Sequence, residues 1–217
     1  MYEDKSNQYF SYCRTDLLKH IPMNKKNKVL EIGAGSGETL LKAKESGLAE
    51  YIVGVDLTQV DNSNQSHPGI DKFIIGNIET TKLDLESNYF DVLMCGDVLE
   101  HLVDPWQCLA TLRPLLKDGG VIIASIPNIR YWKASMGLVF GGRWNYCEQG
   151  VLDRSHLRFF VKETIKDLFK SSGFKIQTFE QMGPQRESGF VAWAMNILTL
   201  GALSDLLTVQ YIIVASK

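Results

Sequence analysis

The sequence has little of what marks several classes of protein. Its four cysteines are scattered and form no Cys-x-x-Cys pair, and its four histidines show no metal-ligand spacing. This argues against a disulfide framework and a structural zinc, so we predict no metal site and a reducing, cytoplasmic location. The 23 basic residues are mixed with 25 acidic ones and form no run, so nothing predicts a nucleic-acid partner.

The sequence also lacks a long apolar run. Its first residues are polar and carry mixed charges, unlike a secretion signal. The longest apolar stretch, 189–203, is interrupted by Asn196 and Thr199 and is shorter than the ~20 residues that span a bilayer. We therefore expect no transmembrane segment. The stretch suits a lid or a homodimer face, and a membrane-surface contact is the less favoured third use.

What the sequence does have is a repeated switch between strand and helix periodicity. Strands are expected at 28–32, 51–56, 72–77, 90–97, 121–127, 174–181 and 207–217, and helices at 36–47, 105–116 and 162–173. The early strands are uniformly apolar, which is typical of a parallel sheet covered on both faces. We predict an α/β fold with helices on both sides of a mostly parallel sheet.

No repeat, low-complexity tract or linker divides the chain. We predict a single domain over 1–217, with a helical lead-in at 1–27 and insertions at about 128–160 and 183–206. Insertions after the carboxyl ends of strands are where such folds carry substrate specificity.

The stretch "VLEIGAGSGETL", 29–40, places glycines between a strand and a helix. Glycines at 33, 35 and 37 allow tight turning and close approach of a ligand to the backbone. The third glycine comes one position too early for a dinucleotide motif, and Glu38 stands where that motif has glycine. Glu31 adds a carboxylate, which opposes a pyrophosphate but suits a cationic ligand.

At these residues the chain resembles the class I S-adenosylmethionine-dependent methyltransferases, whose first motif is acidic-x-Gly-x-Gly-x-Gly. The resemblance covers about 27–182 and the final strand, including "FDVLMCGDVLEHLVDP". It implies a Rossmann-like seven-stranded sheet with an antiparallel last strand, and S-adenosyl-L-methionine as cofactor. The residues expected to bind it are Glu31, Gly33, Ala34, Gly35, Gly37, Asp56, Leu57, Asn77, Ile78 and Asp97.

Three of these residues have specific expected roles. Asp56 ends the second strand, where a carboxylate accepts both ribose hydroxyls, and Asn77 matches the position that binds the adenine edge through its carbonyl. Asp97 suits the cofactor's ammonium group, with helix capping as an equal alternative.

The second half, with "SIPNIRYW" and "GRWNYCEQGVLDRSHLRFF", resembles a bacterial subgroup associated with cell-surface polysaccharide synthesis. The resemblance implies O-methylation of a sugar or glycan intermediate. Methylation of a small non-sugar metabolite is one alternative. Another is a non-catalytic S-adenosylmethionine-binding partner in a glycan-synthesis complex, and a nicotinamide dehydrogenase is the least favoured.

A sugar hydroxyl is a poor nucleophile, so we expect a histidine as general base. His20 and His67 read as surface residues, which leaves His156 and His101 as the catalytic candidates. The structural alternatives are that His101 ties the fourth-strand loop to the next helix, and that Asp153 pairs with His156 or with an arginine.

Residues of the first insertion are the expected substrate contacts. Arg154 and Arg158 could bind a phosphate of a diphosphate-linked sugar, with an Asp153–Arg158 pair as the structural alternative. Tyr131 and Tyr146 could stack on a sugar face, although core packing is the more frequent use of such rings.

Overall fold

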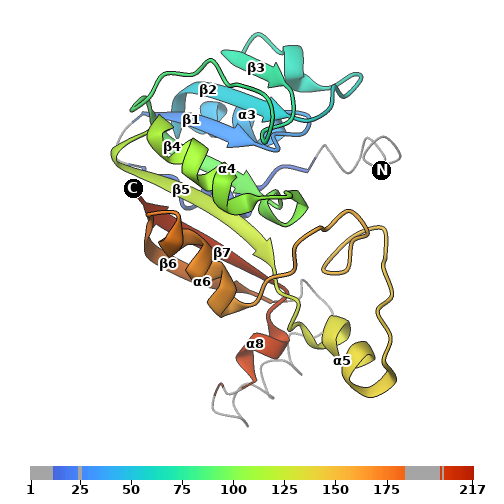
Figure 1. The fold of residues 1–217 in the computed structure, drawn as a ribbon. Coiled ribbons are helices and arrows are strands. Elements are labelled where there is room, and N and C mark those ends of the chain that lie inside the picture. Colours follow the sequence, from blue (N-terminus) through green and yellow to red (C-terminus); the bar gives the residue numbers. More distant parts are fainter. Residues whose placement is uncertain (1–11, 24–25, 184–200, 202) are drawn as a thin grey trace.

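The computed structural model describes residues 12–23, 26–183, 201 and 203–217, and its centre is one seven-stranded sheet (Figure 1). The strand order is β3-β2-β1-β4-β5-β7-β6. Every neighbouring pair is parallel except the two that β7 makes, with β5 and with β6. The strands are β1 Asn27–Ile32, β2 Ala49–Asp56, β3 Lys72–Ile75, β4 Phe90–Gly96, β5 Leu116–Pro127, β6 Lys175–Met182 and β7 Gln210–Ser216. This confirms the predicted fold class.

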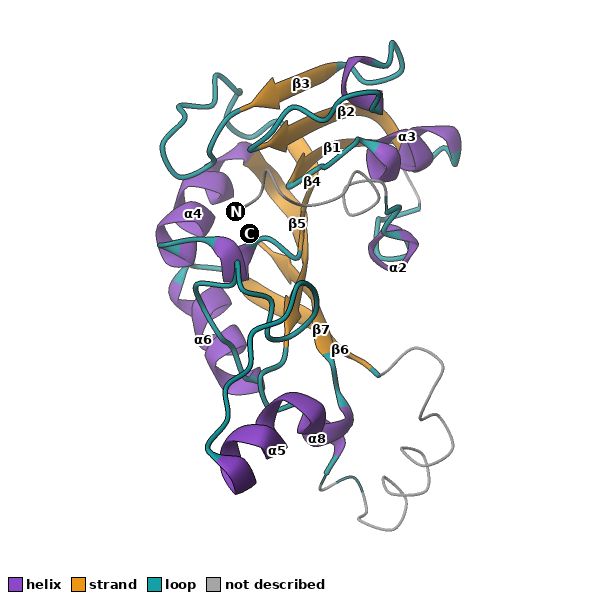
Figure 2. Ribbon diagram, turned by 90° about the vertical axis from the view of Figure 1, so that its right-hand side faces the viewer, coloured by secondary structure: helices purple, strands orange, loops and turns teal. Residues whose placement is uncertain are grey.

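Helices cover both faces of the sheet (Figure 2). On one face lie α4 (Pro105–Leu112) and α6 (Lys162–Ser171), and on the other α2 (Thr15–Leu18) and α3 (Glu38–Glu45). Each face has its own apolar core, the larger one under α4 and α6. The central strands face both cores, which is why their sequences are apolar at nearly every position.

The predicted boundaries are wrong where backbone chemistry overrides the apolar pattern. The helix expected to reach residue 116 ends at Leu112 and continues as one 3-10 turn, because Pro114 has no N–H to continue the helix. The strand expected at 121–127 begins earlier, at Leu116, and so includes the "DGG" of 118–120. Gly119, at φ +77°, and a register shift against β4 absorb the irregularity there.

The expected insertion at 128–160 leaves the sheet after β5 and returns to the same place. A parallel bridge joins Asn128 to Phe160, so its two ends are fixed side by side. Between them lie α5 (Trp132–Gly141) and a long loop that passes over the carboxyl edge of the sheet (Figure 1). In the second expected insertion, α8 covers Ser204–Leu207.

Two expectations concern parts of the chain that are only partly described. The apolar stretch 189–203 lies outside the described residues except for Gly201 and Leu203. In the lead-in, the described residues 12–23 and 26–27 contain the single helical turn of α2. Among the described helices, none has the length and hydropathy that crossing a bilayer requires.

Candidate active site

The turn from β1 to α3 is built by glycines in the left-handed backbone region. Gly33 has φ +72°, and a Cβ there would lie 2.4 Å from Cγ2 of Val98. Gly37 has φ +85° at the N-cap of α3, where a Cβ would lie 2.7 Å from Cδ1 of Ile70. Neither position accepts a side chain without movement of its neighbour, so the sequence pattern follows from the geometry of the turn.

This turn forms one wall of a cavity of about 660 Å³ at the carboxyl edge of the sheet. The cavity lies where strand order reverses between β1 and β4, the usual ligand position in open α/β sheets. Nine of the ten residues expected to bind the cofactor line it: Glu31, Gly33, Ala34, Gly35, Asp56, Leu57, Asn77, Ile78 and Asp97. Gly37 instead shapes the turn behind it. The assignment of each residue to cofactor binding stays a prediction.

Asp56, at the end of β2, holds the glycine turn in place. Its Oδ2 accepts a hydrogen bond from the backbone N–H of Gly35 at 2.7 Å, and its Oδ1 accepts one from the N–H of Thr58 at 3.1 Å. Burial raises its pKa, and these backbone donors oppose that shift. Oδ1 also accepts from the Thr58 hydroxyl at 3.4 Å, whereas Oδ2 keeps a further acceptor site, which fits the expected ribose contact.

Asn77 lies on the wall of the first cavity, and its predicted contact with the adenine edge stays a prediction. Its side-chain carbonyl accepts a hydrogen bond from the backbone N–H of Glu79 at 2.8 Å. That carbonyl therefore has one acceptor site left for an adenine amino group, while the side chain helps to form the loop after β3.

Glu31 is a buried carboxylate on the cavity wall. Its side chain is 3% exposed, and within the described part of the chain its Oε2 has no hydrogen-bond partner. Burial raises its pKa to about 8, against the opposing influence of Arg14. A buried acid with an unpaired oxygen fits a cationic group in this cavity.

Arg14, from the segment before α2, also reaches into this cavity. Its Nη1 lies 2.5 Å from Oδ2 of Asp97, and its Nη2 donates to Ser125 Oγ at 3.0 Å and to Asp16 at 2.8 Å. Ser125 and Gln210 also donate to the Asp97 carboxylate. Asp97 sits in the left-handed region at φ 55° and is held from three sides.

Helix capping, the alternative expected for Asp97, is not its role. The N-cap of the following α4 helix is Asp104, which accepts from the N–H of Gln107, and the 3-10 turn η2 (Leu99–His101) has Val98 at its N-cap. The Asp97 carboxylate remains on the cavity wall beside Arg14.

A second cavity of about 290 Å³ adjoins the first. Asp97, His101 and Gln149 belong to the walls of both cavities. The other lining residues come from η2, from the first insertion and from the ends of β5 and β7, and include Glu100, Asp153, His156 and Gln210.

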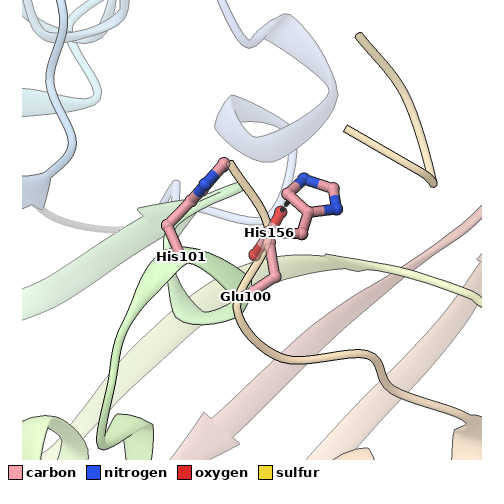
Figure 3. Close-up of side chains that lie close together, drawn as sticks. All are labelled: Glu100, His101 and His156. Atoms are coloured by element: carbon pink, nitrogen blue, oxygen red, sulfur yellow. Dashed lines mark ion pairs between the residues drawn. The ribbon is translucent and has the colours of Figure 1, made fainter. Parts of the chain in front are cut away.

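The two predicted catalytic histidines meet at this junction (Figure 3). His101 comes from η2 and His156 from the insertion loop, and their ring centroids are 4.7 Å apart. Nδ1 of His101 lies 3.1 Å from the carbonyl oxygen of Ser155. His101 thus contacts the insertion loop, which is close to its expected structural alternative and leaves the catalytic prediction open.

Asp153 forms part of the loop that carries His156. Its Oδ1 accepts hydrogen bonds from the N–H of Ser155 at 2.9 Å and from its hydroxyl at 2.6 Å. Its backbone carbonyl accepts from the N–H of His156 at 3.1 Å. These bonds close a tight turn that places His156 beside η2.

The four predicted substrate residues do not line either cavity. Tyr131 is buried in a small apolar cluster, and Tyr146 packs edge-on against Trp144. Arg154 pairs with Glu148 at 2.6 Å, and Arg158 donates to the carbonyl oxygen of Val103. In the structure three of these residues contact other residues of the insertion and Arg158 contacts the loop before α4, and their contact with a substrate stays a prediction.

Arg14, Glu100, Gln149 and Gln210 line these cavities although no motif pointed to them. Glu100 carries a detectable signal, because it is a charged residue next to His101 in the turn shortly after a buried strand. The other three come from segments far apart along the chain, and nothing local in the sequence places them at the sheet edge.

Comparison with known proteins settles the family. The profile of a family described as "Methyltransferase domain" matches residues 6–178. The chain belongs to this methyltransferase family. The expected class I methyltransferase is therefore confirmed, and with it S-adenosylmethionine as the cofactor. The unpaired Glu31 oxygen, the glycine turn and the Asp56 carboxylate fit that cofactor's cationic and ribose groups.

The sequence identities to individual relatives of known name are low. The chain is 26% identical over 200 residues to the mitochondrial ubiquinone biosynthesis O-methyltransferase of Homo sapiens, covering 85% of this chain and 53% of the relative. It is 29% identical over 154 residues to the Cereibacter sphaeroides enzyme of the same name, with coverages of 67% and 59%. The chain thus spans little more than half the length of these relatives. Neither name refers to polysaccharide synthesis, so the expected subgroup is not supported.

A solved structure of similar fold is the SAM-dependent methyltransferase from Archaeoglobus fulgidus. It is 24% identical, covers 98% of this chain and 95% of its own, and has a TM-score of 0.64. At this identity the likeness concerns the fold.

Proposed function

We propose that this methyltransferase transfers a methyl group to a hydroxyl of a small molecule bound in the second cavity. The observation that carries the proposal is that the two cavities share His101, Asp97 and Gln149. A methyl group presented at the edge of the first cavity therefore faces an acceptor in the second. S-adenosylmethionine held in the first cavity would supply an electrophilic methyl group on its sulfonium, with the thioether as leaving group.

The residues of this chain have three tasks in that reaction. Glu31 and Asp56 bind the cofactor's charged and ribose groups, so that its methyl group is held in one position. The insertion loop covers the carboxyl edge and limits the access of water. A histidine accepts the proton of the hydroxyl, and we favour His101 over His156, because His101 lies on the walls of both cavities and His156 only on the second.

Two acceptor classes have support. The second cavity presents amide, carboxylate and imidazole groups from Gln149, Gln210, Asp153 and His156, which favours a polyhydroxylated acceptor such as a sugar. The names of the relatives favour a phenolic hydroxyl like that methylated in ubiquinone biosynthesis. We propose the sugar class first, because polar groups surround the space.

The test measures S-adenosylhomocysteine formation with a panel of nucleotide-linked sugars and a panel of catechols. A His101→Gln variant should lose about 10²–10⁴-fold in kcat/KM with the active acceptor. A His67→Gln variant, at an exposed position outside both cavities, serves as the matched control. Cofactor binding without turnover on both panels would contradict the proposal and favour a non-catalytic binding protein.

A further inference from the structure

The buried carboxylate of Glu100 has no part in the proposed reaction. Its side chain is 1% exposed, and neither Oε atom has a hydrogen-bond partner in the described part of the chain. The basic side chain that faces this carboxylate is His156. Its Nε2 lies 4.0 Å from Oε1, and a dashed line in Figure 3 marks the pair. An unpartnered carboxylate is costly to bury, so this position favours a cation beside it.

Two imidazoles are oriented beside this carboxylate. Nδ1 of His101 lies 3.1 Å from the carbonyl oxygen of Ser155, and Nδ1 of His156 lies 3.2 Å from that of Val151. A carbonyl oxygen only accepts hydrogen bonds, so Nδ1 carries a proton in both rings, and in the neutral form of each ring Nε2 carries the lone pair. Metal-binding histidines are oriented in the same way, by a backbone carbonyl on the opposite ring nitrogen.

The three side chains converge. One ligand atom from each of Glu100, His101 and His156 lies within 4.8 Å of the other two. Figure 3 shows that Glu100 and His101 extend from η2, while His156 comes from the insertion loop. Asp97 and Asp153 add negative charge near Glu100.

We propose that Glu100, His101 and His156 bind one divalent transition-metal ion at the wall of the second cavity. Two imidazoles and one carboxylate suit Zn²⁺ or Co²⁺ better than Mg²⁺, which prefers oxygen ligands. Metal–nitrogen bonds are about 2.0–2.1 Å long, so the three groups must move closer by roughly 1 Å when the ion binds.

The proposal deepens the proposed function and rests on it only for the role of the ion. Three protein ligands leave coordination positions open, as in catalytic rather than structural sites. An acceptor hydroxyl bound there loses its proton more readily. The proton passes to solvent, the oxygen–methyl bond forms, and the sulfur–methyl bond breaks as S-adenosylhomocysteine leaves. With the ion bound, both histidines are ligands, and the ion replaces the histidine base of the proposed function in activating the hydroxyl.

The test uses the chelator-treated full chain without cofactor or acceptor, so that it is independent of turnover. Isothermal titration with CoCl₂ or ZnCl₂ should show one ion per chain, with MgCl₂ binding at least 10-fold more weakly. Glu100→Gln and His156→Gln should each weaken Co²⁺ binding at least 10-fold. His67→Gln is the control, since it replaces an exposed histidine outside the cluster.

The absorption spectrum of the Co²⁺-loaded wild type gives a second readout that needs no variant to fold. Ligand-field bands of an ion bound by nitrogen and oxygen should appear at one equivalent. A wild type that gives no such bands and binds no ion at submillimolar concentration would overturn the proposal, as would folded variants with wild-type affinity. If metal binds but no acceptor is methylated, the proposed function fails and the metal site stands.

Discussion

Glu31 provides the sharpest quantitative prediction. Its pKa is about 8 in the folded chain, against 4.5 as its ordinary value. The folded state therefore keeps a proton that the unfolded state releases between pH 4.5 and 8. Stability must fall as the pH rises through this window and then level off above it.

The size of the effect follows from the two pKa values. Between pH 5 and pH 9 the free energy of unfolding should decrease by about 4 kcal/mol on account of this one group. In a Glu31→Gln variant that contribution is absent. The difference in unfolding free energy between variant and wild type should therefore shift by about 4 kcal/mol in favour of the variant over the same range.

Urea denaturation at several pH values measures this difference. Glu45→Gln is the matched control, because Glu45 is an exposed glutamate at the end of α3 and its replacement should leave the pH profile unchanged. If the free energies of unfolding of wild type and Glu31→Gln changed with pH in the same way, the reasoning would be refuted. That result would mean that Glu31 has the same pKa in the folded and the unfolded state.

The same proton has a consequence for cofactor binding. The cationic group of S-adenosylmethionine favours ionised Glu31, so binding at pH 7 should release close to one proton from the wild type and none from Glu31→Gln. Titration calorimetry in buffers of different ionisation enthalpy counts that proton. Equal proton release from both proteins would show that the cofactor does not contact this carboxylate.

Three further substitutions test the walls of the first cavity. Gly33→Ala should destabilise the fold by at least about 1–2 kcal/mol in thermal unfolding and exceed Gly47→Ala, which has a similar φ of +71° but open space around it. Arg14→Gln should cost about 1–3 kcal/mol in urea unfolding, because it breaks a largely buried pair, whereas the exposed Lys19→Gln should cost under about 1 kcal/mol. Asp56→Asn should weaken S-adenosylmethionine binding about 10-fold or more in calorimetry, because one carboxylate oxygen that accepts from backbone N–H groups is lost. Equal losses of stability for Gly33→Ala and Gly47→Ala, or for Arg14→Gln and Lys19→Gln, would contradict the roles given to Gly33 and Arg14. Unchanged S-adenosylmethionine affinity in Asp56→Asn would contradict the role given to Asp56.

The sheet and the cofactor cavity could be predicted because their signals are local. The glycine turn requires left-handed backbone at fixed positions, and Asp56 ends a strand that the apolar pattern already indicates. The surroundings of Asp97, where the two cavities meet, depend instead on long-range contacts. Arg14 and Gln210 reach Asp97 from segments 83 and 113 residues away, and periodicity carries no information about such pairs.

The first insertion also shows how little local sequence patterns say about long-range contacts. Its aromatic and arginine residues suggested a substrate site, yet the structure uses Tyr131 and Arg158 to pack the loop. His156 lies on the wall of the second cavity, in the part of the loop that returns to begin α6. Which side chains of a loop face inward depends on its turns, and those are set by backbone bonds such as the ones around Asp153.

The position of β7 has a consequence for how the molecule assembles. Residues 210–216 insert between β5 and β6, so β6 has no partner in the sheet until this late segment arrives. The pairing of Val121 with Ser216 closes a long loop, which slows folding. Gln210, at the start of β7, also completes the contacts of Asp97. During synthesis the contacts of Asp97 on the cavity wall are therefore complete only after residues 210–216 have left the ribosome.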